Sequence, residues 1–485
     1  MSVKDALPPD PRRWAMFVIL LVGAFLPPLD FFIVNVALPS IKQDLIASVS
    51  AEQLVISAYA GLYAVTLITG GRLGDIYGRG RVFFVGLTGF AGASLLCGLA
   101  WSPGSLIAGR ALQGVTAAVM APQALASVQA IFPDAEKPLA LSLYGAVFGL
   151  AAVIGQVLGG ILISLDLFGM GWRIIFLVNL PVAALVTLFG LPVLTDTRAR
   201  HPIKLDLVGV ALSVLTLGTL IVPLIKGREA GWPVWAWVAL TATPFLAWLF
   251  WRYEARLSDA GGAPLLDPRA LNAPGLGRAL VISLLFYTIA PFFLLFSIYL
   301  QAALGTSALS AGLVFLPFGA GFLLGPLMAP ACKRALGLYV NATGMGMESA
   351  GFIGMVWLIS ATPAGVYPVP GLLAALLFMI GFGQGLGLPT LMRMVTGRVA
   401  PVYSGMIAGV ASSTLQISTA LSVAVIGGVF YAILDGRTDP PAITQAFSIA
   451  LACIAVCLGA GMLLSITLVR GPALADGKAA TRAAS

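Results

Sequence analysis

Charged residues are scarce in this chain: they make up 9% of its 485 residues, whereas 59% are hydrophobic. Soluble domains carry roughly a quarter charged residues, so this composition excludes an ordinary globular enzyme. Acidic residues are fewer than basic ones, 19 against 27, which gives a formal net charge of +8. Because the basic residues lie in short segments between apolar runs, the excess indicates membrane topology and not a nucleic-acid-binding surface.

Metal and redox ligands are also few. The single His, His201, lies in a loop, and the four cysteines include no Cys-x-x-Cys pair. A metal or redox site needs clustered ligands, so we expect no metal and no cofactor. No segment between the apolar runs is long enough for a soluble catalytic domain. We therefore expect a protein that is not an enzyme.

Apolar runs near twenty residues recur along the whole chain, and each can cross a bilayer core of about 30 Å. The first run is too long for the apolar part of a signal peptide, so it is interpreted as a retained span. The sequence predicts fourteen spans, at residues 14–36, 52–71, 82–101, 104–126, 139–164, 172–194, 206–225, 233–251, 277–301, 310–331, 338–360, 370–392, 404–434 and 444–469.

The distribution of Lys and Arg supports an even number of spans. With the N-terminus in the cytoplasm, most of the 27 basic residues fall in cytoplasmic segments, as the positive-inside rule requires. The outer side receives Lys42, Arg173, Lys226, Arg228 and Arg437, and Arg110 lies inside a span. An error of one span would scramble this alternation, so both termini are predicted to be cytoplasmic.

The loop after the second span reads Gly71-Arg-Leu-Gly-Asp75-Ile-Tyr-Gly78-Arg79-Gly-Arg81. Its glycines allow sharp turns at helix ends, and Asp75 can pair with a nearby Arg or cap a helix. It resembles the signature loop of the major facilitator superfamily, although the usual basic residues are missing at Ile76 and Gly80. The resemblance implies a conformational latch that breaks and re-forms as two bundles rock, formed by Gly71, Asp75, Gly78, Arg79 and Arg81.

The fourth span contains Leu106, Arg110, Gln113, Gly114, Ala117 and Ala118, which resemble the family's Arg-containing motif associated with proton transfer. An Arg inside a span costs at least about 2.5–3.5 kcal/mol on insertion scales. Arg110 is therefore expected to face the interior and pair with a carboxylate or a carbonyl. Extension of its side chain to the outer interface is the alternative.

Further motifs point to one branch of the family. In the fifth span, Gly155-Gln156-Val-Leu-Gly159-Gly160 resembles the antiporter motif, with Gln156 in place of its proline; plain helix packing is the alternative for these glycines. The runs 29–39, 172–181 and 404–428 resemble those of the fourteen-span drug/proton antiporters (EmrB/QacA type). The resemblance covers about residues 14 to 434.

This resemblance implies an all-α major facilitator fold. Two six-helix bundles, residues 1–194 and 277–469, would enclose a central cavity; residues 195–276 would form two extra helices and a linker, and 470–485 a cytoplasmic tail. The implied function is export of amphiphilic or cationic drugs and toxins across the bacterial inner membrane, in exchange for protons, by alternating access. Transport of a lipid, siderophore, sugar or other metabolite by the same fold is the alternative. Membrane lipids are expected partners, and a periplasmic adaptor is left open.

Two acidic residues lie well inside predicted spans, Asp30 and Glu348. An ionisable group at membrane depth is a functional hypothesis by default. With Arg110, these two carboxyls are the candidate proton-coupling residues. A structural role is the alternative for each: Asp30 would bond to the helix end broken by Pro27 and Pro28, and Glu348 would be the buried partner of a polar group.

Aromatic and Met side chains can line an apolar cavity and hold flat, lipophilic cations through stacking and cation–π contacts. Packing against lipid or other helices is the alternative for each of them. The candidate substrate-binding residues are Asp30, Phe31, Tyr59, Tyr63, Tyr287, Phe293, Met345 and Glu348.

Overall fold

The computed structural model describes residues 11–133, 136–194, 205–399 and 403–470, and within these residues the regular structure is entirely helical. The first group of helices is α1 (Arg13–Asp44), α2 (Val49–Tyr77), α3 (Arg79–Gly98), α4 (Pro103–Ile131), α5 (Lys137–Leu165), α6 (Ile174–Leu177) and α7 (Asn179–Gly190). Then follow α8 (Leu207–Glu229), α9 (Val234–Asp259) and α10 (Pro268–Leu271). The last group is α11 (Leu276–Phe286), α12 (Ala290–Ile298), α13 (Ala308–Val314), α14 (Leu316–Leu336), α15 (Val340–Ser360), α16 (Pro370–Thr396), α17 (Ser404–Leu434) and α18 (Pro440–Arg470).

Serine side chains cap the starts of α2 and α4. The Ser48 side chain accepts a hydrogen bond from the Ala51 amide at the start of α2. Ser102 and Ser105 form a reciprocal capping box at the start of α4, where Pro103 occupies the first turn. These side chains satisfy amide groups that have no partner within their own helix. These two capped helix starts lie between apolar runs.

The described residues contain thirteen candidate membrane spans. The longest, Ala308–Ser360, has 53 residues and includes α13, α14 and α15. Both α14 and α15 have 21 residues, enough to cross the bilayer core, and Gly337 between them has a φ of 60° that interrupts the helix. The predicted count of fourteen stays a prediction.

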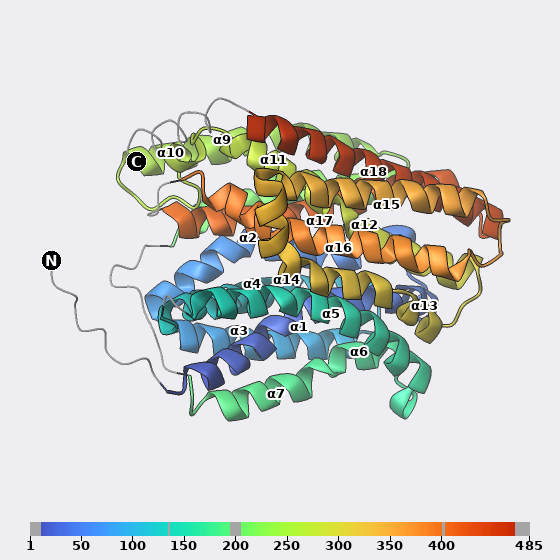
Figure 1. Ribbon diagram of the computed structural model, residues 1–485, viewed down its shortest axis with the longest axis horizontal. Helices are drawn as coiled ribbons and strands as arrows, with labels where there is room; N and C mark the ends of the chain where they lie inside the picture. The colour runs from blue at the N-terminus through green and yellow to red at the C-terminus, as the bar shows by residue number, and fades with distance from the viewer. Residues whose placement is uncertain (1–10, 134–135, 195–204, 400–402, 471–485) are drawn as a thin grey trace.

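The helices before and after the linker form two groups that lie against each other (Figure 1). Contacts between the groups run along α2 and α17, and along α5 with α13 and α14. The pair α8 and α9 is peripheral. Helix α8 packs on α2 and α17, whereas only 6% of the most apolar stretch of α9 is buried. The predicted boundaries at residues 194 and 276 stay predictions, and most of the predicted tail lies outside the described residues.

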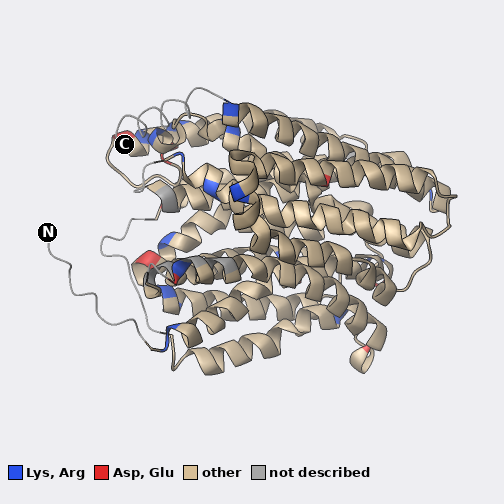
Figure 2. Ribbon diagram, viewed as in Figure 1, with Lys and Arg blue, Asp and Glu red and all other residues tan. Residues whose placement is uncertain are grey.

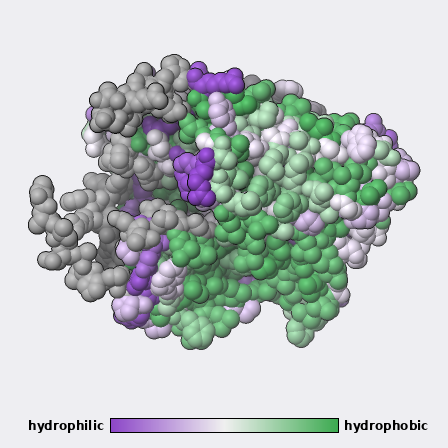
Figure 3. Space-filling model, viewed as in Figure 1, coloured by the Kyte–Doolittle hydropathy of each residue, from purple (hydrophilic) through white to green (hydrophobic). Residues whose placement is uncertain are grey.

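Charge is unevenly distributed along the long axis. Most Lys and Arg residues lie toward the left end of the ribbon in Figure 2, where α1 begins and α18 ends, and the visible face between the two ends is largely hydrophobic (Figure 3). A hydrophobic band between polar ends is the surface that a lipid bilayer requires. The predicted orientation, with this end in the cytoplasm, is the one that the positive-inside rule favours, and it stays a prediction.

Candidate functional site

An ion pair between Asp30 of α1 and Arg110 of α4 lies buried in the first group of helices. Asp30 is 0% exposed and Arg110 is 1% exposed. Arg110 Nη1 donates to Asp30 Oδ2, and its Nε donates to the backbone oxygen of Val55 on α2 at 3.1 Å. Arg110 therefore faces the interior and pairs with a carboxylate and a carbonyl, as expected, instead of extending to the interface.

Three polar side chains complete the surroundings of Asp30. Gln113 and Asn179 each donate to Asp30 Oδ1 at 3.1 Å, and both also donate to Ser94 Oγ, at 2.8 and 3.2 Å. Gln113 Oε1 in turn accepts from Arg110 Nη1 at 2.8 Å. Arg110, Gln113 and Asn179 thus all donate to Asp30, and together they provide donors for both of its carboxyl oxygens. Helices α1, α2, α3, α4 and α7 meet at this network.

Tyr59 of α2 connects the ion pair with the centre of the molecule. The Arg110 guanidinium carbon lies over the Tyr59 ring, 4.3 Å from the ring centroid. The Tyr59 hydroxyl donates to the backbone oxygen of Pro27 at 3.2 Å. On its other side, Tyr59 stacks on Tyr63, with centroids 6.0 Å apart and planes at 11°. The ion pair is therefore in contact with Tyr59, which in turn contacts Tyr63.

These rings form part of a central cavity of about 40 Å³ between the two groups of helices. Its walls are Pro27, Pro28, Phe31, Phe32, Tyr59, Tyr63, Phe148, Tyr287, Gln416 and Thr419. Drug-sized ligands occupy pockets of about 300–1,000 Å³. The structure is thus closed around its centre, and a ligand of that size requires the helix groups to separate.

Four of the predicted substrate-binding residues line this cavity: Phe31, Tyr59, Tyr63 and Tyr287. Phe293 lies behind them and packs edge-on against Phe32 and Phe318. Asp30, Met345 and Glu348 are 0% exposed and are not among the lining residues. The substrate role of each of these eight residues stays a prediction.

The sequence prediction missed Phe148, Gln416 and Thr419 as cavity residues. Gln416 and Thr419 lie one helical turn apart on α17, and this polar pair at mid-span was the available signal. Phe148 carried no such signal, because an isolated Phe in an apolar helix does not reveal which face it occupies.

Glu348 of α15 has surroundings opposite to those of Asp30. It is 0% exposed, and neither of its carboxyl oxygens has a hydrogen-bond partner within the described residues. Helices α15 and α16 approach closely here: a Cβ added to Gly383 of α16 would lie only 2.9 Å from the Glu348 Cγ. An unpaired buried carboxylate is costly, so this site accommodates the neutral acid.

The signature loop forms the turn between α2 and α3. Arg79 donates to Asp75 at 3.0 Å and to the backbone oxygen of Ala126 on α4 at 3.2 Å. Gly78 has a φ of 103°, a conformation that favours glycine. Gly71 packs near Pro122, and Arg81 is exposed. Asp75 therefore pairs with an Arg, one of the two predicted roles.

The glycines of the antiporter-like stretch of α5 face two neighbouring helices. A Cβ on Gly155 would lie 2.8 Å from the Phe32 Cβ on α1, and one on Gly160 would lie 2.6 Å from the backbone oxygen of Ala308 on α13. Gly159 faces Ile33 of α1. Gln156 is 1% exposed, and neither atom of its amide has a partner in the described part of the chain. These glycines allow α5 to join the two groups of helices.

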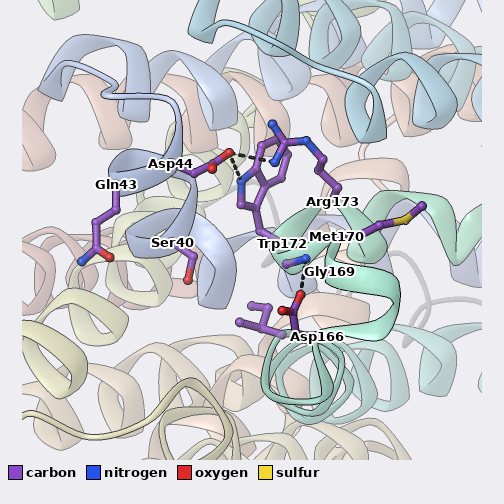
Figure 4. A pocket seen from close by; sticks show the side chains of 10 residues that line it. Ser40, Gln43, Asp44, Asp166, Gly169, Met170, Trp172 and Arg173 are labelled. Carbon is purple, nitrogen blue, oxygen red and sulfur yellow. Dashed lines mark hydrogen bonds and ion pairs between the residues drawn. The ribbon is translucent and has the colours of Figure 1, made fainter.

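Two polar clusters lie at the end opposite the signature loop. Glu52 of α2 accepts from Lys42 of α1 at 3.2 Å and from the Tyr431 hydroxyl of α17 at 2.7 Å, which joins the two helix groups. Nearby, Asp44 accepts from Trp172 Nε1 at 3.0 Å and from Arg173 Nη1 at 2.7 Å (Figure 4). The second cluster borders an open pocket of about 480 Å³.

Comparisons with known proteins agree with this architecture. The family model of the Major Facilitator Superfamily matches residues 20–422. The chain is 35% identical to a probable actinorhodin transporter of Streptomyces coelicolor, over 89% of this chain and 74% of that protein. It is 36% identical to a puromycin resistance protein of Streptomyces alboniger, over 97% of this chain and 93% of that one.

A solved structure from work on substrate recognition in proton-dependent oligopeptide transporters superposes with a TM-score of 0.69. The alignment covers 94% of this chain and 98% of that chain at 14% identity, so it supports the fold alone.

Proposed function

The chain belongs to the Major Facilitator Superfamily and is a multi-pass membrane transporter, not an enzyme, and we propose that it exports amphiphilic or cationic drugs and toxins in exchange for protons. Support comes from the names of its relatives, which include an actinorhodin transporter and a puromycin resistance protein. The transporter resides in the bacterial inner membrane with both termini in the cytoplasm. Its substrates are small molecules, and protons and membrane lipids are its other partners.

The observation that carries this proposal is the contact between the buried Asp30–Arg110 pair and the cavity wall through Tyr59. Proton uptake by Asp30 removes the negative charge opposite Arg110. It also leaves Arg110, Gln113 and Asn179 with one acceptor fewer. Arg110 and the rings that pack on it then relax together. Proton binding thereby changes the walls of the substrate cavity, which is the coupling that antiport requires.

Glu348 supplies the second carboxyl of the mechanism. When the two helix groups separate, the space around this acid opens, and an ionised Glu348 offers a counter-charge to a cationic substrate. The aromatic walls contributed by Phe31, Tyr63 and Tyr287 stack on the substrate. Protonation of the acids on the outer side weakens cation binding, and deprotonation on the inner side resets the cycle.

Alternating access follows from the two sets of contacts between the helix groups. At the outer end, the Glu52–Tyr431 hydrogen bond holds α2 against α17. Further toward the cytoplasmic end, the Ser413 hydroxyl of α17 donates to the backbone oxygen of Ala64 on α2 at 2.7 Å, and within the first group the Asp75–Arg79 pair fixes the turn between α2 and α3. We infer that rocking of the groups breaks these contacts in turn, so that the cavity opens to one side at a time.

The proposal is tested in inverted vesicles with an imposed pH gradient, using ethidium and puromycin as probes. The wild type is expected to dissipate the gradient on addition of a probe, whereas Asp30→Asn and Glu348→Gln are expected to lose most of this response. Asp259→Asn is the matched control, because this side chain is 80% exposed.

Two outcomes would count against the proposal. If neither probe dissipates the gradient with the wild type, the substrate class is wrong, and a lipid, siderophore, sugar or other metabolite becomes the substrate to test. If both variants respond like the wild type, the assignment of the proton-coupling residues is wrong.

A further inference from the structure

Two further acids lie buried where the extra helices meet the linker. Asp206 precedes α8 and is 5% exposed, and Glu254 of α9 is 0% exposed. Asp206 Oδ1 accepts from the Gly209 amide at 2.8 Å and from the Tyr253 hydroxyl at 3.0 Å. The cluster lies at the same end of the molecule as the signature loop. It is formed by residues next to α8, in α9 and in the segment after α9, whereas the Asp30–Arg110 pair joins α1 to α4.

Both acids bind the segment 260–267, here termed the strap, which connects α9 to α10. The Leu265 amide donates to Asp206 Oδ2 at 3.2 Å, and the Leu266 amide donates to Glu254 Oε2 at 2.8 Å. These bonds satisfy two backbone groups that irregular chain would otherwise leave unpaired in a buried place. The acids therefore hold the strap from the side of α8 and α9.

Arg72 of α2 also binds the strap, through backbone oxygens. It donates to the backbone oxygen of Ala263 at 3.0 Å and to that of Pro264. Arg72 belongs to the signature loop segment and interacts electrostatically with both acids. The strap thus bonds to one cation and two acids.

Asp206 and Glu254 each direct one carboxyl oxygen at the other, and a proton between these two oxygens would stabilise the contact. A Cβ on Gly209 would meet both Glu254 Oε1 and Asp206 Oδ2, so these atoms lie next to each other. Oε1 of Glu254 is buried and has no donor among the described residues. Two carboxylate oxygens are both acceptors and repel each other, whereas one proton turns them into a donor and an acceptor.

We propose that Asp206 and Glu254 bind one proton between them, and that this proton fixes the strap against Arg72 of the signature loop. With the proton, the two acids and Arg72 are electrically balanced. Without it, two adjacent carboxylates share one cation and separate, and Leu266 loses its acceptor. The other titratable group that faces the pair from the described residues is the Tyr253 hydroxyl, which is neutral and donates to Asp206.

The site would make the strap sensitive to cytoplasmic pH. The strap leads from the extra helices into α10 and α11, so its attachment to α2 connects the signature loop with the second helix group. A protonated pair keeps this attachment, and loss of the proton releases it. This role is separate from proton exchange at Asp30 and needs no substrate.

Hydrogen–deuterium exchange of the full-length protein in nanodiscs tests the site, with rates corrected for the intrinsic effect of pH. In the wild type, the strap amides are expected to lose protection as pH rises from mildly acidic to alkaline. Glu254→Gln is expected to keep protection across this range, because its amide donates permanently to Asp206 and its oxygen still accepts from Leu266. Asp259→Asn, a substitution at an 80% exposed side chain that precedes the strap, is expected to follow the wild type.

An infrared measurement gives an independent readout. A carbonyl band of a protonated carboxylic acid that titrates with the strap is expected in the wild type and is expected to be absent from Glu254→Gln. Strap protection that does not change with pH in the wild type, or an equal pH dependence in Glu254→Gln, would overturn the proposal. Neither measurement depends on a transported substrate, so failure here is distinguishable from failure of the export proposal.

Discussion

The guanidinium of Arg110 lies 4.3 Å from the centroid of the Tyr59 ring, and this contact joins a buried ion pair to the wall of the central cavity. The ion pair would otherwise be a structural element of the first helix group. Through Tyr59, whose hydroxyl also donates to the backbone oxygen of Pro27, it adjoins the space in which a substrate would lie. The helix break expected at Pro27 and Pro28 is absent, because α1 continues as one helix through both prolines.

Tyr59→Phe is expected to retain most substrate-dependent proton movement, whereas Tyr59→Leu is expected to lose it. The Phe ring preserves the cation–π contact and the stack on Tyr63, and it loses one hydrogen bond worth about 1 kcal/mol. The Leu side chain also loses a desolvated cation–π contact worth about 2 kcal/mol, which corresponds to more than a tenfold effect. Gradient dissipation in inverted vesicles measures the difference; equal activity of the two variants would show that the ring is dispensable.

Arg110→Lys is expected to abolish coupling although it preserves the charge. A guanidinium donates at once to Asp30, Gln113 and the Val55 oxygen, and a single ammonium on a flexible stem cannot reproduce this geometry.

Arg110→Ala is expected to lower stability by about 3–5 kcal/mol, because it leaves Asp30 buried and unpaired. The double variant with Asp30→Asn is expected to recover part of this loss. Thermal unfolding in detergent measures the stability of Arg110→Ala, Asp30→Asn and the double variant. Additive losses in the double variant would contradict a direct ion pair.

The sequence predicted the members of this site better than their arrangement. Asp30 and Arg110 were identified because ionisable groups at membrane depth are rare and costly. Their pairing across 80 positions, with Asn179 from the sixth predicted span, was not accessible, because long-range contacts depend on how helices pack.

The buried acids Glu52 and Glu254 were missed for a different reason. Both lie near span ends, where an acid is usually solvated, and only the packing of α17 and of the strap encloses them. The fold class followed directly from apolar run length and signature motifs. The described residues contain thirteen candidate spans and not fourteen, because α14 and α15 join through the short turn Gly337–Tyr339 and count as one span.

Tyr431→Phe is expected to shift the transporter toward an outward-open arrangement. The hydroxyl of Tyr431 provides the hydrogen bond to Glu52 that joins α2 to α17 at the outer end, and bonds to charged groups contribute about 1.5–3 kcal/mol. Labelling by a membrane-impermeant thiol reagent at a cysteine introduced in place of Gln53, which bonds to the Val423 oxygen, reports this opening. The labelling rate is expected to rise several-fold, and an unchanged rate would mean that the bond does not hold the outer end closed.

Gly160→Ala is expected to impair transport, whereas Gly145→Ala in the same helix is expected to be silent. A Cβ at position 160 would lie 2.6 Å from the backbone oxygen of Ala308, so α5 and α13 must move apart. A Cβ at position 145 meets nothing within 4 Å, and alanine favours a helix over glycine by about 1 kcal/mol. Transport and thermal stability are compared for both variants. Because the two substitutions are chemically identical and lie on one helix, a defect confined to position 160 isolates the contact between the helix groups, while full activity of Gly160→Ala would show that this contact is not needed for alternating access.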